Sequence, residues 1–183
     1  TSLVIWGVYS LLTLAGIAAF VLTGQSPFDA VCHTFAAVGT GGFGTRPDSF
    51  AGYSPGSQWA CVVLMFMAGT SFVLLLAVLR GRGRDLLRDV EWRTYAGILG
   101  GAVALTLLVR LGDEGLPGDW ETFVRDSAFS VVSVGSTTGF ATADFDRWPA
   151  ALHVLFLGLM FCGACTGSTS GSHKVARIVL YAK

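Results

Sequence analysis

Four stretches of the chain carry no charged side chain, and three of them are about as long as a membrane-crossing helix. The stretches run from Leu3 to Leu22, from Trp59 to Leu79, from Thr94 to Val109 and from Ala150 to Ser172. A helix needs roughly 20 apolar residues to cross a hydrocarbon core of about 30 Å. The third stretch is shorter, but Arg93 and Arg110 at its ends can extend their charged groups to the interfaces. The pattern predicts an all-α integral membrane protein.

The composition leaves little room for a soluble alternative. Hydrophobic residues make up 52% of the chain and charged residues 13%, whereas a soluble domain usually carries about a quarter charged residues. Four apolar segments would leave too little polar surface to cover a soluble core. The first segment lacks the basic start and the small-residue cleavage site of a signal peptide, so it is interpreted as a span. The 12 basic and 12 acidic side chains balance, and no nucleic-acid partner is expected.

Arginine placement predicts the orientation in the membrane. Five arginines crowd the short linker between the second and third stretches: Arg80, Arg82, Arg84, Arg88 and Arg93. Short basic loops stay on the cytoplasmic side. Lys174, Arg177 and Lys183 fall on the same side, two spans later. We therefore expect a multi-pass protein of the cell membrane whose long connections, 23–57 and 112–149, face outside.

The sequence repeats itself at a shift of 97 positions, the separation of Asp29 and Asp126. The same shift aligns further residues of the two halves: Thr40 with Thr137, Gly42 with Gly139, Phe43 with Phe140, Thr45 with Thr142, and Ser71 with Ser168. Each copy contains a span, a short helix, a loop rich in Gly and Thr, and a second span. The predicted units are residues 1–93 and 94–183.

Each outer connection begins with a helix of half the length of a span. Residues 27–37 would form a helix of about 16 Å at 1.5 Å per residue. Ser26 suits its N-cap, Pro27 its first position and Asp29 its first turn. In the second unit, Asp119 suits the cap, Glu121 the first turn, and residues 123–134 continue the helix. Because both helices are apolar, they are predicted to re-enter the membrane within protein.

Both half-length helices lead into glycine-containing loops at membrane depth, predicted to form a selectivity filter. The filter residues are Val38, Gly39, Thr40, Gly41, Gly42 and Phe43 in one loop and Gly135, Ser136, Thr137, Thr138, Gly139 and Phe140 in the other. Irregular backbone is tolerated there only in protein or beside water. Glycine lets carbonyls turn inward, and those carbonyls, with the Thr40 and Thr137 hydroxyls, can replace the hydration shell of a cation. K+ is expected at Thr40, Gly41, Gly42, Thr137, Thr138 and Gly139.

The ion in this prediction is the transported substrate, and no cofactor is expected. Neither loop contains a carboxylate, which argues against a ring selective for divalent cations. Two other interpretations of the loops were considered. Residues 39–44 match the dinucleotide fingerprint G-x-G-x-x-G, but they follow a helix rather than a strand, and Arg46-Pro47 comes next. A glycine-rich turn that only packs helices would not need to occur twice, each time after a half-length helix.

The last span is predicted to be interrupted. Residues 150–165 suit an apolar helix and residues 175–182 a second one, with small polar residues between them. Such residues compete with helical hydrogen bonding. This gate loop comprises Thr166, Gly167, Ser168, Thr169, Ser170, Gly171, Ser172 and Lys174. Placed below the filter, it could obstruct ions. The alternative is a packing face, since Gly163, Gly167 and Gly171 have G-x-x-x-G spacing.

Three motifs resemble the Trk/Ktr/HKT superfamily of potassium transporters, in particular its bacterial Trk pore-forming subunits. They are Thr40-Gly41-Gly42-Phe43, the segment from Ser136 to Asp144, and the segment from Gly167 to Val175. The resemblance implies four span–pore helix–span repeats around one pore, of which this chain holds the second and third. It implies that Gly42 and Gly139 are filter glycines, which go with potassium where serine goes with sodium tolerance. Ser172 and His173 stand where many bacterial relatives have glycine and an aliphatic residue. The resemblance therefore extends to the filter but not to the details of gating.

The resemblance also implies partners: the remaining two repeats of the same parent chain, a second copy in a homodimer, and a cytosolic nucleotide-binding regulatory subunit. The expected function is potassium uptake through a glycine-containing carbonyl filter. The alternative is a potassium- and sodium-permeable or neutral-solute channel of similar architecture. A membrane enzyme would need a nucleophile–base pair or an acidic cluster within the spans, so no enzyme is expected. A structural scaffold would not require two glycine loops.

Overall fold

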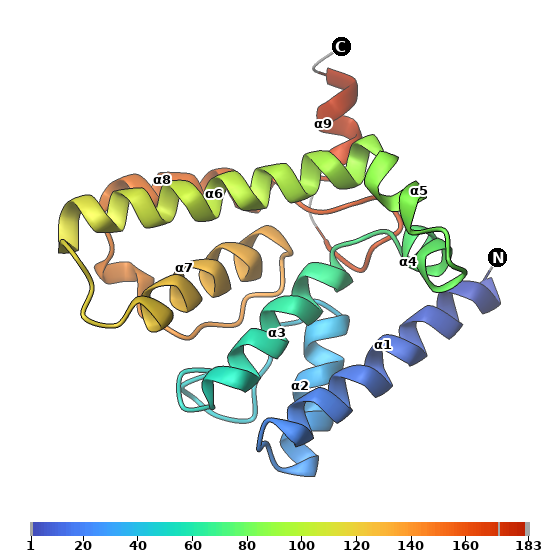
Figure 1. Cartoon of the computed structure of the whole chain (residues 1–183), viewed down its shortest axis with the longest axis horizontal. Helices are drawn as coiled ribbons and strands as arrows, with labels where there is room; N and C mark the ends of the chain where they lie inside the picture. Colours follow the sequence, from blue (N-terminus) through green and yellow to red (C-terminus); the bar gives the residue numbers. More distant parts are fainter. Residues whose placement is uncertain (1, 172, 182–183) are drawn as a thin grey trace.

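The computed structural model describes residues 2–171 and 173–181, and within them the chain is helical, without a strand (Figure 1). Ser172, a predicted gate-loop residue, lies outside the described residues. The helices are α1 (Ser2–Leu22), α2 (Pro27–Val38), α3 (Pro55–Ala68), α4 (Phe72–Leu79), α5 (Gly83–Arg88), α6 (Val90–Glu114), α7 (Trp120–Gly135), the short 3-10 turn η1 (Phe145–Arg147), α8 (Ala150–Cys162) and α9 (Val175–Tyr181).

Two helices, α1 and α6, are each long and apolar enough to cross a membrane. The predicted span over residues 59–79 is divided into two helices, α3 and α4, which meet at an angle of 107° across a break at residues 69–71. The last apolar helix also ends earlier than predicted, at Cys162 instead of Cys165. Gly163, with φ 42°, leaves the helical conformation at that point.

The half-length helices begin as the sequence indicates. The Ser26 hydroxyl accepts the Asp29 backbone N–H at 3.1 Å at the start of α2. The Asp119 carboxylate accepts the Glu121 N–H at 3.0 Å at the start of α7. Both contacts satisfy N–H groups that a helix start leaves without an intrahelical partner. α2 extends one residue beyond the prediction, to Val38, and α7 one residue beyond, to Gly135.

The two predicted units have the same packing order. In the first, α1 packs on α2, and α2 on α3; in the second, α6 packs on α7, and α7 on α8. The units meet mainly where α3 packs on α7. α6 begins at Val90, four residues before the proposed unit boundary at 94, because Asp89 caps it by accepting the Trp92 N–H at 2.8 Å.

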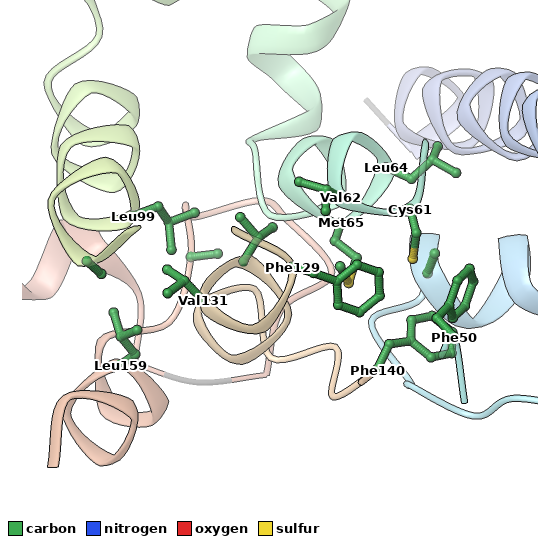
Figure 2. Close-up of a cluster of buried hydrophobic side chains, with 14 of the residues drawn as sticks. Phe50, Cys61, Val62, Leu64, Met65, Leu99, Phe129, Val131, Phe140 and Leu159 are labelled. Atoms are coloured by element: carbon green, nitrogen blue, oxygen red, sulfur yellow. The ribbon is translucent and has the colours of Figure 1, made fainter. Parts of the chain in front are cut away.

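α7 lies at the centre of the hydrophobic core, between α3, α6 and α8 (Figures 1 and 2). Phe129 and Val131 of α7 are fully buried. They belong to a cluster that also holds Met65 of α3, Leu99 of α6 and Leu159 of α8. Burying a large apolar side chain contributes about 1.5–3 kcal/mol relative to exposure. The second glycine loop, which follows α7, is therefore attached to the most densely packed helix.

A tyrosine packs against the end of α3. The Tyr95 hydroxyl lies 2.2 Å from where a Cβ on Gly69 would stand. Tyr95 itself is 1% exposed and stacks on Phe66 with ring centroids 5.3 Å apart. No residue with a side chain fits at position 69 while this ring stays in place, so α3 ends at a glycine.

Candidate functional site

The two glycine loops share one backbone conformation, residue by residue. Thr40 and Thr137 both have positive φ, 51° and 62°, and so do Gly42 and Gly139, at 69° and 89°. These are the residues that the 97-position shift aligns. The left-handed region costs an L-residue roughly 1–2 kcal/mol, so its occurrence at equivalent threonines marks a required loop shape. The repeat predicted from the sequence is therefore visible in the backbone.

The loops lie against each other. A Cβ built on Gly42 would stand 2.0 Å from the carbonyl oxygen of Thr138 and 3.2 Å from the carbonyl carbon of Gly139. Only glycine permits this approach of one backbone to another. The corresponding position on Gly139 faces open space, with nothing within 4 Å. The structure thus brings together the two segments that the sequence proposed as halves of one site.

The carbonyl oxygens of the loops fall into two groups. Those of Val38 and Phe140 accept hydroxyl donors, Thr169 at 2.8 Å and Ser133 at 2.6 Å respectively. No hydrogen bond between described residues ends on the carbonyls of the six residues predicted to hold K+: Thr40, Gly41, Gly42, Thr137, Thr138 and Gly139. Gly41 and Gly139 are exposed and Thr40, Gly42 and Thr137 are half-buried, so water or a cation can reach these carbonyls. The second group therefore retains the capacity to bind a cation.

The threonine hydroxyls of the loops bond to the segment between α8 and α9. Thr40 Oγ1 donates to the carbonyl of Thr169 at 3.1 Å. Thr137 Oγ1 accepts the N–H of Gly171 at 3.0 Å and shares a second bond with the Ser170 hydroxyl at 3.0 Å. Both hydroxyls are therefore bonded to residues 169–171 of the interrupted span, and their role as ligands of the ion stays a prediction.

The interrupted span, described at residues 163–171 and 173–174, is not helical there, and its two ends are tied together. The Val175 N–H donates to the Ala164 carbonyl at 3.2 Å. Glu91 Oε1 accepts the N–H of Thr166 at 2.5 Å and of Ala176 at 3.2 Å. Lys174 Nζ donates to the Ser170 carbonyl at 2.5 Å within the loop. These bonds hold the two ends of the interruption close together.

The two breaks in the chain are bonded to each other. The Cys165 N–H donates to the Gly69 carbonyl at 3.0 Å, and the Phe72 N–H donates to the Gly167 carbonyl at 3.2 Å. Sequence reasoning missed the first break and the role of Glu91. The alignment of Ser71 with Ser168 was the available signal for the break, since it matches a residue of the gate loop to one at residues 69–71. Nothing local indicates that Glu91 binds backbone amides.

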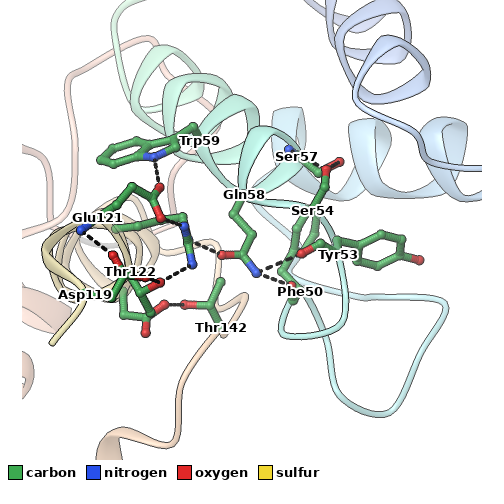
Figure 3. A network of polar contacts seen from close by, with 12 residues as sticks. Phe50, Tyr53, Ser54, Ser57, Gln58, Trp59, Asp119, Glu121, Thr122 and Thr142 are labelled. Atoms are coloured by element: carbon green, nitrogen blue, oxygen red, sulfur yellow. Dashed lines mark hydrogen bonds and ion pairs between the residues drawn. The ribbon is translucent and has the colours of Figure 1, made fainter.

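A polar network joins the units beside the loops (Figure 3). Buried Arg125 donates to Gln58 Oε1 at 2.6 Å and pairs with Glu121. Gln58 Nε2 in turn donates to the Phe50 carbonyl at 2.9 Å, and the Trp59 indole donates to Glu121 at 2.9 Å. The charge of Arg125 is thus paired and hydrogen-bonded, as burial requires. The network holds α3, α7 and the connection after the first loop in one arrangement.

Comparisons with known proteins identify the family of this chain. The TrkH family model, described as a cation transport protein, matches residues 1–109 and 118–183. Among similar proteins are the Trk system potassium uptake proteins TrkH of Halomonas elongata, 35% identical over 188 residues, and TrkH of Escherichia coli, 36% identical over 186 residues. Each alignment covers 100% of this chain and 38% of the relative.

A solved structure is also similar. The crystal structure of the potassium transporter TrkH from Vibrio parahaemolyticus superimposes with a TM-score of 0.91 and 32% identity, over 97% of this chain and 38% of that one. The chain thus spans 38% of the length of these relatives. Family match, sequence identity and fold agree, and the chain belongs to the TrkH family of cation transport proteins.

Proposed function

We propose that this chain forms two quarters of a potassium uptake pore, in which α2 and α7 are re-entrant pore helices and residues 38–43 and 135–140 are filter loops. The observation that carries the proposal is the contact of the loops at Gly42 and Thr138, with six carbonyl oxygens free of hydrogen bonds among the described residues. Neutral carbonyl dipoles suit an ion that loses its hydration shell readily. The names of the relatives, which refer to potassium uptake and transport, support potassium as the ion.

The loops lie at the right ends of their helices for a cation site. α2 ends at Val38 and α7 at Gly135, and the filter follows each directly. The carboxyl end of a helix carries partial negative charge, roughly half an elementary charge. Two such ends beside the loops favour a cation. Neither loop contains a charged side chain, so the ion is not held too tightly to leave the site.

Two further repeats of the parent chain complete the ring in this proposal. Phe140 of the second loop packs on Phe50 and His33 of the first unit, with ring centroids 4.7 Å and 6.0 Å away. Its equivalent, Phe43, is 82% exposed, as expected if a preceding unit supplies the missing aromatic partners. The open space beside Gly139 marks the opposite edge, where a following unit would bring a carbonyl as Thr138 does for Gly42.

Residues 166–172 and Lys174 act as the gate in this proposal. Thr169, Ser170 and Gly171 are hydrogen-bonded to Thr40 and Thr137 of the filter loops. A segment in this position obstructs the inner side of the site, and the small residues let it move. The packing alternative explains the small residues but not the bonds to the filter threonines.

The cellular setting is part of the proposal. We place the protein in the cell membrane, with α5 and α9 toward the cytoplasm, where Figure 1 has them near the same end of α6. A homodimer and a cytosolic nucleotide-binding regulatory subunit follow from the family resemblance. Transport without covalent chemistry is the proposed activity, rather than catalysis.

The test is ion flux through the full-length protein in proteoliposomes. Imposed gradients of potassium, sodium and a neutral solute such as glycerol should give a flux in the order potassium, sodium, solute. Gly139→Ser should lower the potassium-to-sodium ratio, because a side chain at φ 89° strains the carbonyls beside it. A solute flux as fast as the potassium flux would favour the neutral-solute channel. Equal potassium and sodium fluxes would favour the channel permeable to both ions.

A further inference from the structure

One side-chain hydrogen bond occurs in both units at the outer end of the glycine loop. Thr45 Oγ1 donates to Asp29 Oδ1 at 2.6 Å, and Thr142 Oγ1 donates to Asp126 Oδ1 at 3.0 Å. The acceptor lies 16 residues before the donor in each case. The 97-position shift aligns donor with donor and acceptor with acceptor, so the repeat preserves the bond itself.

The bond connects two points that the loop separates. Each aspartate lies nine residues before the last residue of its half-length helix (38 − 29 and 135 − 126), and each threonine lies seven residues after it (45 − 38 and 142 − 135). Nine residues of helix span about 14 Å. The carboxylate therefore anchors the end of the loop that leaves the site. This anchor lies about 14 Å along the helix from the helix end at which the loop begins.

The inner end of each loop has its own anchor. Backbone bonds at the helix ends hold it: Gly41 N–H to the Ala36 carbonyl at 2.7 Å, and Thr138 N–H to the Ser133 carbonyl at 2.9 Å. The filter glycines, Gly42 and Gly139, lie between the inner anchor and the outer one. The direction of their carbonyls depends on both ends of the segment being fixed.

A charge at a helix start does not explain the pair of aspartates. Asp29 lies in the first turn of α2, where a negative charge is favourable without any partner. Asp126 is the seventh residue of α7, beyond the first turn, where the favourable effect of the helix dipole has decayed. What Asp29 and Asp126 share is the bond to the loop threonine.

We infer that Asp29 and Asp126 are positioning residues for the filter, each holding the outer end of its loop through the hydroxyl of Thr45 or Thr142. The inference rests on the proposed function, since it concerns how that filter discriminates between ions. Bonds to an ionised acceptor are shorter and about twice as strong as neutral ones. Without the bond, the loop can widen and accept ions of other sizes.

The test compares variants of the full-length protein in proteoliposomes, with potassium and sodium flux normalised to the amount of transporter. Thr45→Val and Thr142→Val keep the shape and remove the donor. We expect each to lower the potassium-to-sodium ratio by roughly three- to tenfold, the range for loss of one hydrogen bond of typical net strength. Thr45→Ser and Thr142→Ser keep the hydroxyl and should retain at least half of the ratio.

Two controls separate positioning from other effects. Asp113→Asn removes an exposed negative charge from the last turns of α6 and should leave the ratio unchanged. Asp126→Asn combined with Thr142→Val should be no worse than Thr142→Val alone, because both changes act on the same bond. Additive losses would overturn the inference, as would valine variants that fold, transport and discriminate like the unmodified protein. An unmodified protein without potassium flux would instead refute the proposed function.

Discussion

At the level of single residues, the site depends on glycines at which another group occupies the space that a side chain would need. The Thr138 carbonyl occupies the space of a Cβ on Gly42, and the Tyr95 hydroxyl that of a Cβ on Gly69. The two cases differ in what would have to move. At Gly69 the obstacle is the end of a side chain, whereas at Gly42 it is the backbone of the other filter loop.

Gly42→Ala should therefore damage selectivity more than an ordinary glycine substitution. The added methyl group forces the loops apart. The backbone φ of 69° at this position also costs an alanine about 1–2 kcal/mol of strain. We expect a lower potassium-to-sodium flux ratio and a lower melting temperature for the full-length protein. Gly97→Ala is the matched control, because a Cβ there meets nothing within 4 Å and alanine favours the helix. Equal ratios in the two variants would contradict the role given to Gly42.

Outer carboxylates should make stability depend on pH at the acidic end. A hydrogen bond from Thr45 lowers the pKa of Asp29, one from Thr122 lowers that of Asp119, and one from Arg125 lowers that of Glu121. A folded-state pKa below the unfolded value stabilises the protein above the unfolded pKa. The contribution is lost as the pH falls through the folded pKa. Melting temperatures measured from pH 7 to 3 should therefore fall below about pH 4.

Substitution of Asp119 tests this origin of the pH dependence. Asp119→Asn cannot ionise, so it should lower the melting temperature at pH 7 and weaken its decline in acid. Asp113→Asn, in the last turns of α6, has the same charge change and serves as the control. An identical acid profile for Asp119→Asn and the unmodified protein would show that other groups cause the decline.

At the level of elements, the filter loops and the gate loop form one hydrogen-bonded assembly. Thr169 links it to two helix ends, since its hydroxyl donates to the carbonyl of Val38 at 2.8 Å and to that of Ala68 at 3.3 Å. These carbonyls end α2 and α3. The gate loop therefore satisfies backbone groups that the helix ends leave without intrahelical partners.

Thr169→Val should loosen the gate loop and raise the rate of potassium flux. The change removes the hydroxyl and leaves the Thr169 carbonyl, which accepts from Thr40, in place. Because the filter is unchanged, the potassium-to-sodium ratio should stay constant while the rate rises severalfold. Thr169→Ser is the control and should behave like the unmodified protein. A slower flux in the valine variant, with normal amounts of protein in the membrane, would contradict a gating role.

The elements that the sequence predicted best are those fixed by local chemistry. Serine and aspartate caps placed the starts of α2 and α7, and the repeat aligned the two loops correctly. The break between α3 and α4 was not predicted, because residues 59–79 carry no charge and only Gly69, Thr70 and Ser71 interrupt the apolar run. Likewise, the partners of the Thr40 and Thr137 hydroxyls belong to a segment about 130 and 33 residues away, which local pattern cannot reveal.

At the level of the whole molecule, the two units meet through one set of contacts that the repeat can extend. Gly42 approaches Thr138, Phe50 packs on Phe140, and the Phe50 N–H donates to the Ala141 carbonyl at 2.9 Å. The equivalent positions at the two outer edges are open: Phe43 is 82% exposed, and nothing lies within 4 Å of a Cβ on Gly139. Repeating the same junction on both sides would close a ring around the free carbonyls.

The central claim is that these carbonyls bind a dehydrated potassium ion. Rubidium and thallium replace potassium in such sites and scatter strongly, so a crystal structure of the full-length protein grown with either ion tests the claim directly. We predict an anomalous density peak on the axis shared by the loops, within coordination distance of carbonyls from both 40–42 and 137–139. Strong anomalous peaks at other sites, together with no peak between the two loops, would contradict it.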